Sequence, residues 1–273
     1  MNFFKEGESD IKNVFTRIIY RDFSSNTGLA IKNSTYQFST NLVGKLGSLI
    51  FIVILARIIL PETFGLYNLV LSTIMFFYVF SDFGTGQALV YFSSKALKTG
   101  KAKAYTNYLL KIKLFLVLVS ATALIILAKL ISDSYYQKPI FLALIAGSIY
   151  LIFTSIQSFY IALAQSNNDF KSPLLKEISL QLSRIIIIPF VILYFKKTEI
   201  SSSSNVFIIF VMLLIISIFC LFLIYYFSTK NLKLENVSQS KLNSKDKSEV
   251  KSFMFKVSLI TSSILVTPSK TFT

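Results

Sequence analysis

The chain has 273 residues, 53% of them hydrophobic, and a formal net charge of +15, with a mean hydropathy of +0.64. A soluble domain of this length needs apolar residues only in its core, so the composition excludes that class and predicts a polytopic membrane protein. The basic residues fall between apolar runs rather than on one face of a soluble domain, which argues against nucleic acid as a partner. With one cysteine and no histidine, we expect no metal site and no cofactor.

The apolar runs predict the domain organisation. Residues 1–37 are a polar lead-in in which a short surface amphipathic helix would fit the spacing of apolar residues. Six runs long enough to cross a bilayer follow, because about 20 helical residues cover the hydrocarbon core. They lie at 38–60, 66–93, 111–131, 140–164, 178–195 and 206–227.

A polar segment follows the sixth run. Residues 228–252 are rich in Ser, Asn and Lys, which is typical of a flexible linker. A seventh apolar run starts at Phe253 but does not reach spanning length before Pro268. We therefore expect an all-α membrane protein with a cytoplasmic lead-in (1–37), a six-span lobe (38–227), a cytoplasmic linker (228–252) and the incomplete start of a second lobe (253–273).

The Lys and Arg residues between the runs predict the orientation, because cytoplasmic loops of membrane proteins are enriched in them. With the N-terminus in the cytoplasm, the inner segments carry 20 Lys and Arg and the outer segments carry 3. The inner segments are 1–37, 94–113, 165–177 and 228–256, and the outer segments are 61–65, 132–139 and 196–205. We expect a multi-pass protein of the cell membrane, surrounded by lipid, with a cytoplasmic N-terminus.

Charged residues inside the apolar runs are the candidates for function, because a charge within the bilayer usually faces the bundle interior, a cavity or another charge. Lys45, Asp82 and Arg184 fall in the inner half of their runs. They predict a cationic cavity for a diphosphate headgroup, with Asp82 holding or releasing one of the cations. A structural Lys45–Asp82 pair, or snorkelling of the long side chains to the interface, are the alternatives. Arg57 lies near the outer end, where substrate contact competes with an interface anchor or a pairing with Glu62.

Two runs contain residues that favour a bend. Gly84 and Gly86 directly follow Asp82 in a run longer than the bilayer requires, so a broken helix at membrane depth competes with a tilted straight one. Pro189 in the fifth run frees a backbone carbonyl and predicts a kink. Several neutral polar residues could bond either sugar hydroxyls or neighbouring helices. They are Tyr36, Gln37, Asn41, Gln157 and Gln165.

The junction of the first two runs carries a distinctive pattern. It reads Leu55-Ala56-Arg57, Leu60-Pro61-Glu62-Thr63-Phe64-Gly65-Leu66-Tyr67, Ser81-Asp82-Phe83-Gly84 and Gln87-Ala88-Leu89-Val90. This pattern resembles the opening hairpin of polysaccharide biosynthesis flippases, the O-antigen translocases. Their superfamily also holds the multidrug and toxic-compound extrusion transporters and the lipid II flippases. The close match covers the first two runs.

The resemblance implies two six-helix lobes around a central cavity and the movement of lipid-diphosphate-linked oligosaccharide by alternating access. It implies a transporter rather than an enzyme, with a glycan polymerase or export machinery as candidate partners. Compared with that plan the sequence looks truncated to the N-terminal half, and a half-transporter acting as a dimer is the other account. A small-molecule or multidrug exporter and a membrane-embedded polysaccharide polymerase are the alternative functions. Cations in the cavity argue against cationic drugs, and short outer loops argue against the polymerase.

Overall fold

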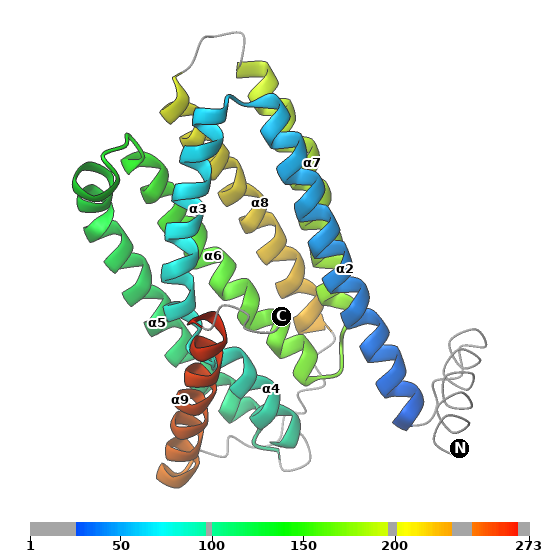
Figure 1. Cartoon of the computed structure of the whole chain (residues 1–273). Coiled ribbons are helices and arrows are strands. Elements are labelled where there is room, and N and C mark those ends of the chain that lie inside the picture. Colours follow the sequence, from blue (N-terminus) through cyan, green and yellow to red (C-terminus); the bar gives the residue numbers. More distant parts are fainter. Residues whose placement is uncertain (1–25, 97–99, 196–200, 231–241, 267–273) are drawn as a thin grey trace, which may run out of the picture.

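A computed structural model describes residues 26–96, 100–195, 201–230 and 242–266, and every regular element within them is a helix (Figure 1). Six helical stretches are long and apolar enough to cross a membrane, which confirms the prediction of an all-α polytopic membrane protein. The amphipathic helix considered for the lead-in falls outside the described residues. The helices are α2 (Asn26–Ile58), α3 (Pro61–Asp82), α4 (Thr85–Ala96), α5 (Ala102–Leu130), the π-helix η2 (Ile131–Tyr136), α6 (Phe141–Ser166), α7 (Lys171–Phe195), α8 (Ser202–Lys230) and α9 (Ser244–Val266).

Several helices begin well before the apolar run that they contain. The clearest cases are α2, which begins at Asn26, α5, which begins at Ala102, and α7, which begins at Lys171. Polar residues outside the hydrocarbon can continue a helix until a cap or a breaker stops it, so hydropathy alone places these starts too late. Side chains that hydropathy places in loops therefore belong to helices.

The second span is broken at Phe83 and Gly84. α3 ends at Asp82, Phe83 has a φ of 37° and Gly84 a φ of 74°, and α4 begins at Thr85. Positive φ is the conformation that glycine adopts with least strain, so Gly84 fits the break. Gly86 lies within the first turn of α4. Whether the break works as a hinge during function stays a prediction.

Apolar packing joins the six spans into one bundle. In Figure 1, α6 and α8 run side by side in the middle, and α2 lies along α7 at one edge. The larger core combines buried side chains of most spans, among them Leu55, Val70, Leu124, Leu144 and Phe210. Large apolar side chains such as Phe115, Ile126 and Phe190 are exposed. In a bilayer these outward residues would face lipid rather than water.

The last helix, α9, begins at Ser244, inside the stretch that the sequence predicts to be a linker. It packs against α4, where Val250 and Met254 are buried in a second core with residues of α5 and α6. The Phe253 ring stacks on Tyr91 with centroids 5.0 Å apart. The residues of α9 before Phe253 are mostly polar, so composition indicated only the part of this helix from Phe253 onward.

Candidate functional site

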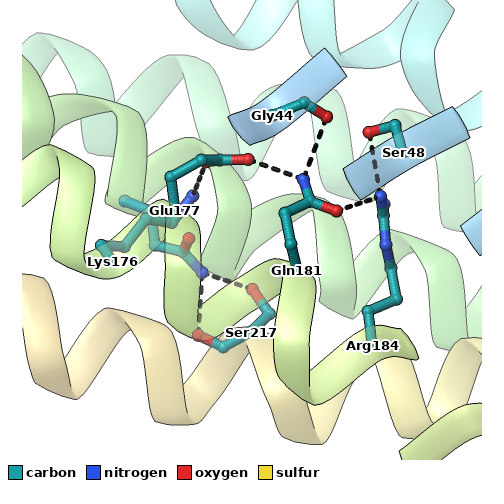
Figure 2. Close-up of polar contacts among 8 residues, drawn as sticks. Gly44, Ser48, Lys176, Glu177, Gln181, Arg184 and Ser217 are labelled. Atoms are coloured by element: carbon teal, nitrogen blue, oxygen red, sulfur yellow. Dashed lines mark hydrogen bonds and ion pairs between the residues drawn. The ribbon is translucent and has the colours of Figure 1, made fainter. Parts of the chain in front are cut away.

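One face of α7 carries three polar residues toward α2. Glu177, Gln181 and Arg184 are spaced four and three residues apart, so they lie above one another on the same side of the helix. The residues of α2 that face them are Gly44, Gly47 and Ser48. Because these residues are small, they leave room for the side chains from α7 (Figure 2). A Cβ atom on Gly47 would lie only 2.6 Å from Cγ of Gln181. The two helices therefore approach closely around this polar cluster.

Gln181 is the centre of the hydrogen-bond network in Figure 2. Its Nε2 donates to Glu177 Oε1 at 2.7 Å and to the carbonyl oxygen of Gly44 at 3.3 Å. Its Oε1 accepts from Nη2 of Arg184 at 2.6 Å. The same Nη2 donates to Ser48 Oγ at 2.9 Å. The amide thus links the carboxylate and the guanidinium on α7 to the backbone of α2.

Arg184 keeps part of its binding capacity unused. Its Cζ lies 4.5 Å from the centroid of the Phe51 ring, a distance at which the ring attracts the cation. Its Nε is buried without a hydrogen-bond partner. A buried N–H without a partner is rare and requires an explanation. This N–H is closed off from solvent, so a ligand would reach it only after the surrounding side chains moved.

Lys176 and Glu177 form an ion pair with Nζ and Oε2 3.4 Å apart. The sequence placed both in a cytoplasmic segment, but the structure places them in α7, and Lys176 is buried. On the other side of α7, Gln157 of α6 donates to Ser217 of α8, to the carbonyl oxygen at 2.8 Å and to Oγ at 2.6 Å. Of its two interpretations, the bond between neighbouring helices is the one observed for Gln157.

An open cavity of about 760 Å³ lies beside this network. Lys45 is exposed on α2 and lines it together with Glu177, while Ser48 belongs both to the lining and to the bond with Arg184. The structure therefore brings the predicted residues Lys45 and Arg184 to one seam, which we call the α2–α7 site. The remaining lining residues are Thr40, Asn41, Gly44, Leu49, Ile52 and Val53.

Asp82 lies in a different place and pairs with a residue that the sequence did not suggest. Lys113 Nζ donates to Asp82 Oδ1 at 2.7 Å, and Thr85 Oγ1 donates to the same oxygen at 3.2 Å. Lys113 is fully buried in α5. The alternative of a Lys45–Asp82 pair is wrong, because the cation at Asp82 comes from α5. The sequence placed Lys113 at the start of the apolar run 111–131 but counted it among the charges of the inner segment 94–113.

Asp82 also lines a second open cavity of about 570 Å³, formed by α3, α4 and α6. Its lining combines polar side chains with apolar ones and carries two aromatic rings. The lining residues are Tyr78, Asp82, Gly86, Gln87, Val90, Tyr91, Ser94, Ser158, Ile161, Ala162 and Gln165. We call this space the Asp82 cavity.

The remaining predicted positions lie away from both cavities. Arg57 is exposed in the last turn of α2. Glu62 accepts a hydrogen bond from Ser202 Oγ at 3.5 Å, and no ion pair joins it to Arg57 among the described residues. Pro189 is buried inside α7, which continues past it to Phe195.

Comparison with known proteins identifies the family of the chain. Searches against curated proteins and against solved structures gave no match. A family model described as polysaccharide biosynthesis protein matches residues 30–267. The match includes both cavities, the broken second span and α9, and it covers far more than half of the chain. The chain therefore belongs to the polysaccharide biosynthesis protein family.

Proposed function

We propose that the chain translocates lipid-diphosphate-linked oligosaccharide across the cell membrane, and that the α2–α7 site receives the diphosphate. The observation that carries this proposal is the charge at the site. Lys45 lines the cavity, Arg184 is joined to it through Ser48, and Glu177 is occupied by Lys176 and Gln181. The local balance is positive, and a guanidinium beside the cavity suits a phosphate group.

The lining of the cavity also suits a lipid. Along α2 it begins with Thr40, Asn41 and Lys45 and continues with Leu49, Ile52 and Val53. The helix rises by about 20 Å over this stretch. A molecule with an anionic head and an apolar chain could therefore contact the polar and the apolar part of this lining at once. A small polar ion would have no use for the apolar part.

The break in the second span supports alternating access. Gly84 has a positive φ and separates α3 from α4 next to Asp82. Broken helices at membrane depth are a common feature of transporters, because they absorb movement around a binding site. In the proposal, α4 moves relative to α3 at Gly84. This movement alters which groups surround the Asp82–Lys113 pair.

The orientation in the proposal follows from the positive charges. The inner segments hold 20 Lys and Arg against 3 outside, and of the inner ones that the structure describes, Lys113 and Lys176 are buried within helices. Without these two lysines, the inner segments still carry far more Lys and Arg than the outer segments. The proposal therefore keeps the N-terminus in the cytoplasm, with lipid-linked substrate loaded from that side.

A transport assay tests the proposed function. The purified chain is reconstituted in liposomes with a fluorescent lipid-diphosphate sugar in one leaflet, and the appearance of the sugar in the other leaflet is followed. We expect Lys45→Ala and Arg184→Ala to lower the rate at least tenfold, while Lys129→Ala, an exposed lysine at the far end of α5, leaves it unchanged. Equal rates for all three variants would contradict the proposal. Movement of lipophilic cations instead of the anionic lipid would indicate a small-molecule exporter.

A further inference from the structure

We propose that the Asp82 cavity binds a neutral sugar unit of the substrate while the α2–α7 site holds its diphosphate. This inference rests on the proposed function and assigns a part of the substrate to each cavity. It is carried by the lining of the cavity, by its charge and by a chain of amides that joins it to the α2–α7 site.

The lining has the chemistry of a sugar site. Sugars offer hydroxyl groups, which donate and accept hydrogen bonds, and apolar C–H faces, which pack on aromatic rings. The cavity is lined by amide and hydroxyl side chains, those of Gln87, Ser94 and Ser158, and by the aromatic side chains of Tyr78 and Tyr91. Its volume of about 570 Å³ lies in the ordinary range for small-molecule sites.

Neighbouring aromatic rings fix the position of the Tyr91 side chain. Its ring stacks on Phe253 of α9 at an interplanar angle of 11°, and Phe92 packs edge-on against it at 5.0 Å. The residue is nevertheless 45% exposed. An aromatic side chain with few rotatable bonds, fixed from one side, loses little conformational entropy when a ligand covers it.

The charge of the cavity favours a neutral ligand over a phosphate. Asp82 Oδ1 is held by Lys113 and Thr85, and 27% of the Asp82 side chain remains exposed. A carboxylate is a strong acceptor for hydroxyl groups. The lining residues that the structure describes for this cavity include no Lys or Arg that would receive a phosphate. The two cavities therefore differ in charge as the two parts of a glycosylated lipid diphosphate do.

A chain of three amides connects the cavities. Gln165 lines the Asp82 cavity and donates through Nε2 to Gln37 Oε1 at 2.9 Å. Gln37 Nε2 donates to Asn41 Oδ1 at 3.4 Å, and Asn41 lines the cavity of the α2–α7 site. The polar surface thus runs from α6 to α2. A glycan attached to a diphosphate at α2 would follow it toward Asp82.

The absence of tryptophan from the sequence makes a direct binding experiment available. Tyr91→Trp introduces a single emitter in the Asp82 cavity, and Tyr135→Trp introduces one at an exposed position of η2, outside both cavities. The probes are a lipid diphosphate that carries N-acetylglucosamine and the same lipid diphosphate without sugar. We expect the sugar-bearing probe alone to shift the emission of Tyr91→Trp, and neither probe to shift that of Tyr135→Trp.

Affinities measured with the same probes test the polar groups. We expect the combined variant Gln87→Ala and Ser158→Ala to weaken the sugar-bearing probe by about tenfold, toward the affinity of the bare lipid. The affinity of the bare lipid should not change, and Thr122→Ala, a hydroxyl on the exposed side of α5, should change neither.

The outcomes separate the two proposals. If wild type binds both probes equally and Tyr91→Trp responds to both or to neither, the sugar assignment is overturned while lipid-diphosphate recognition stands. Loss of both probes to the same extent in the combined variant would also overturn the sugar assignment. If wild type binds neither probe, the proposed function fails and the inference fails with it.

Discussion

Lys113 Nζ lies 2.7 Å from Asp82 Oδ1, and the Lys113 side chain is 1% exposed whereas that of Asp82 is 27% exposed. The cation is the more deeply enclosed partner. A charge buried in an apolar interior is stable only with its counter-charge, so the pair holds α3 and α5 together at the broken end of α3.

Removal of the carboxylate should therefore destabilise the bundle. We expect Asp82→Ala to reduce the free energy of unfolding by roughly 3 kcal/mol, at the lower end for a broken buried pair because the cavity admits water to Asp82. Thermal unfolding of the purified protein in detergent measures this. The double variant Asp82→Ala with Lys113→Met should recover most of the loss, since no charge stays unpaired. Additive losses in the double variant would show that the two side chains do not act as a pair.

Gly84 should not tolerate a side chain. A Cβ atom there would lie 2.9 Å from the carbonyl oxygen of Met254, and the φ of 74° disfavours an L side chain. We expect Gly84→Ala to cost about 1–3 kcal/mol and to loosen α9 from α4. The stability of the variant and the protease sensitivity of α9 measure the effect.

Gly65 offers the matched control for that substitution. It lies inside α3, and a Cβ atom there meets nothing within 4 Å. Alanine is the better helix former, so Gly65→Ala should leave stability unchanged or raise it by about 1 kcal/mol. Equal effects at the two glycines would contradict the role of the contact between Gly84 and α9.

The contact between α2 and α7 predicts a second difference between glycines. A Cβ atom on Gly47 would lie 2.6 Å from Gln181 Cγ, whereas one on Gly44 would lie 3.1 Å from Oε1, at the far end of the Glu177 side chain. We expect Gly47→Ala to displace Gln181, to cost about 1–3 kcal/mol and to reduce lipid-diphosphate binding. Gly44→Ala should have the smaller effect on both measurements, and a larger effect at Gly44 would argue against the observed packing.

Arg184 should not be replaceable by lysine. Nη2 donates to both Gln181 and Ser48, and the planar group lies over Phe51. An ammonium keeps the charge but loses the fork and the stacking. We expect Arg184→Lys to lower the transport rate about tenfold. At Arg57, which is exposed at the end of α2, the same exchange should have no effect; a wild-type rate for Arg184→Lys would mean that charge alone matters.

The sequence predicted the spans, because hydropathy over about 20 residues determines which helices can cross a membrane. It missed Lys113 and Lys176 as buried charges, because both were counted among the cytoplasmic charges. Lys113 lies at the start of the run 111–131, and Lys176 lies just before the run 178–195. A periodic pattern could have indicated Lys113, since Tyr105, Leu109, Lys113 and Val117 occupy one face of α5 at steps of four residues and all are buried. Lysine at such a position points to a partner inside the bundle.

The sequence could not predict which residues the candidate site residues contact. Lys45 and Arg184 were both candidates, but their common seam depends on the packing of α2 against α7, which composition does not specify. The pairing of Asp82 likewise depends on which helix packs behind α3. The chain Gln165–Gln37–Asn41 joins residues 128 positions apart, and only the fold brings them together.

Binding of a fluorescent lipid diphosphate to the purified chain in detergent, compared with the same lipid carrying a neutral headgroup, tests the central claim most directly. We expect saturable binding of the diphosphate, at least tenfold tighter than that of the neutral lipid. Lys45→Glu, which reverses the charge beside the cavity, should remove the preference. Equal affinity for the two lipids, or an unchanged preference in Lys45→Glu, would contradict the recognition of an anionic headgroup at the α2–α7 site.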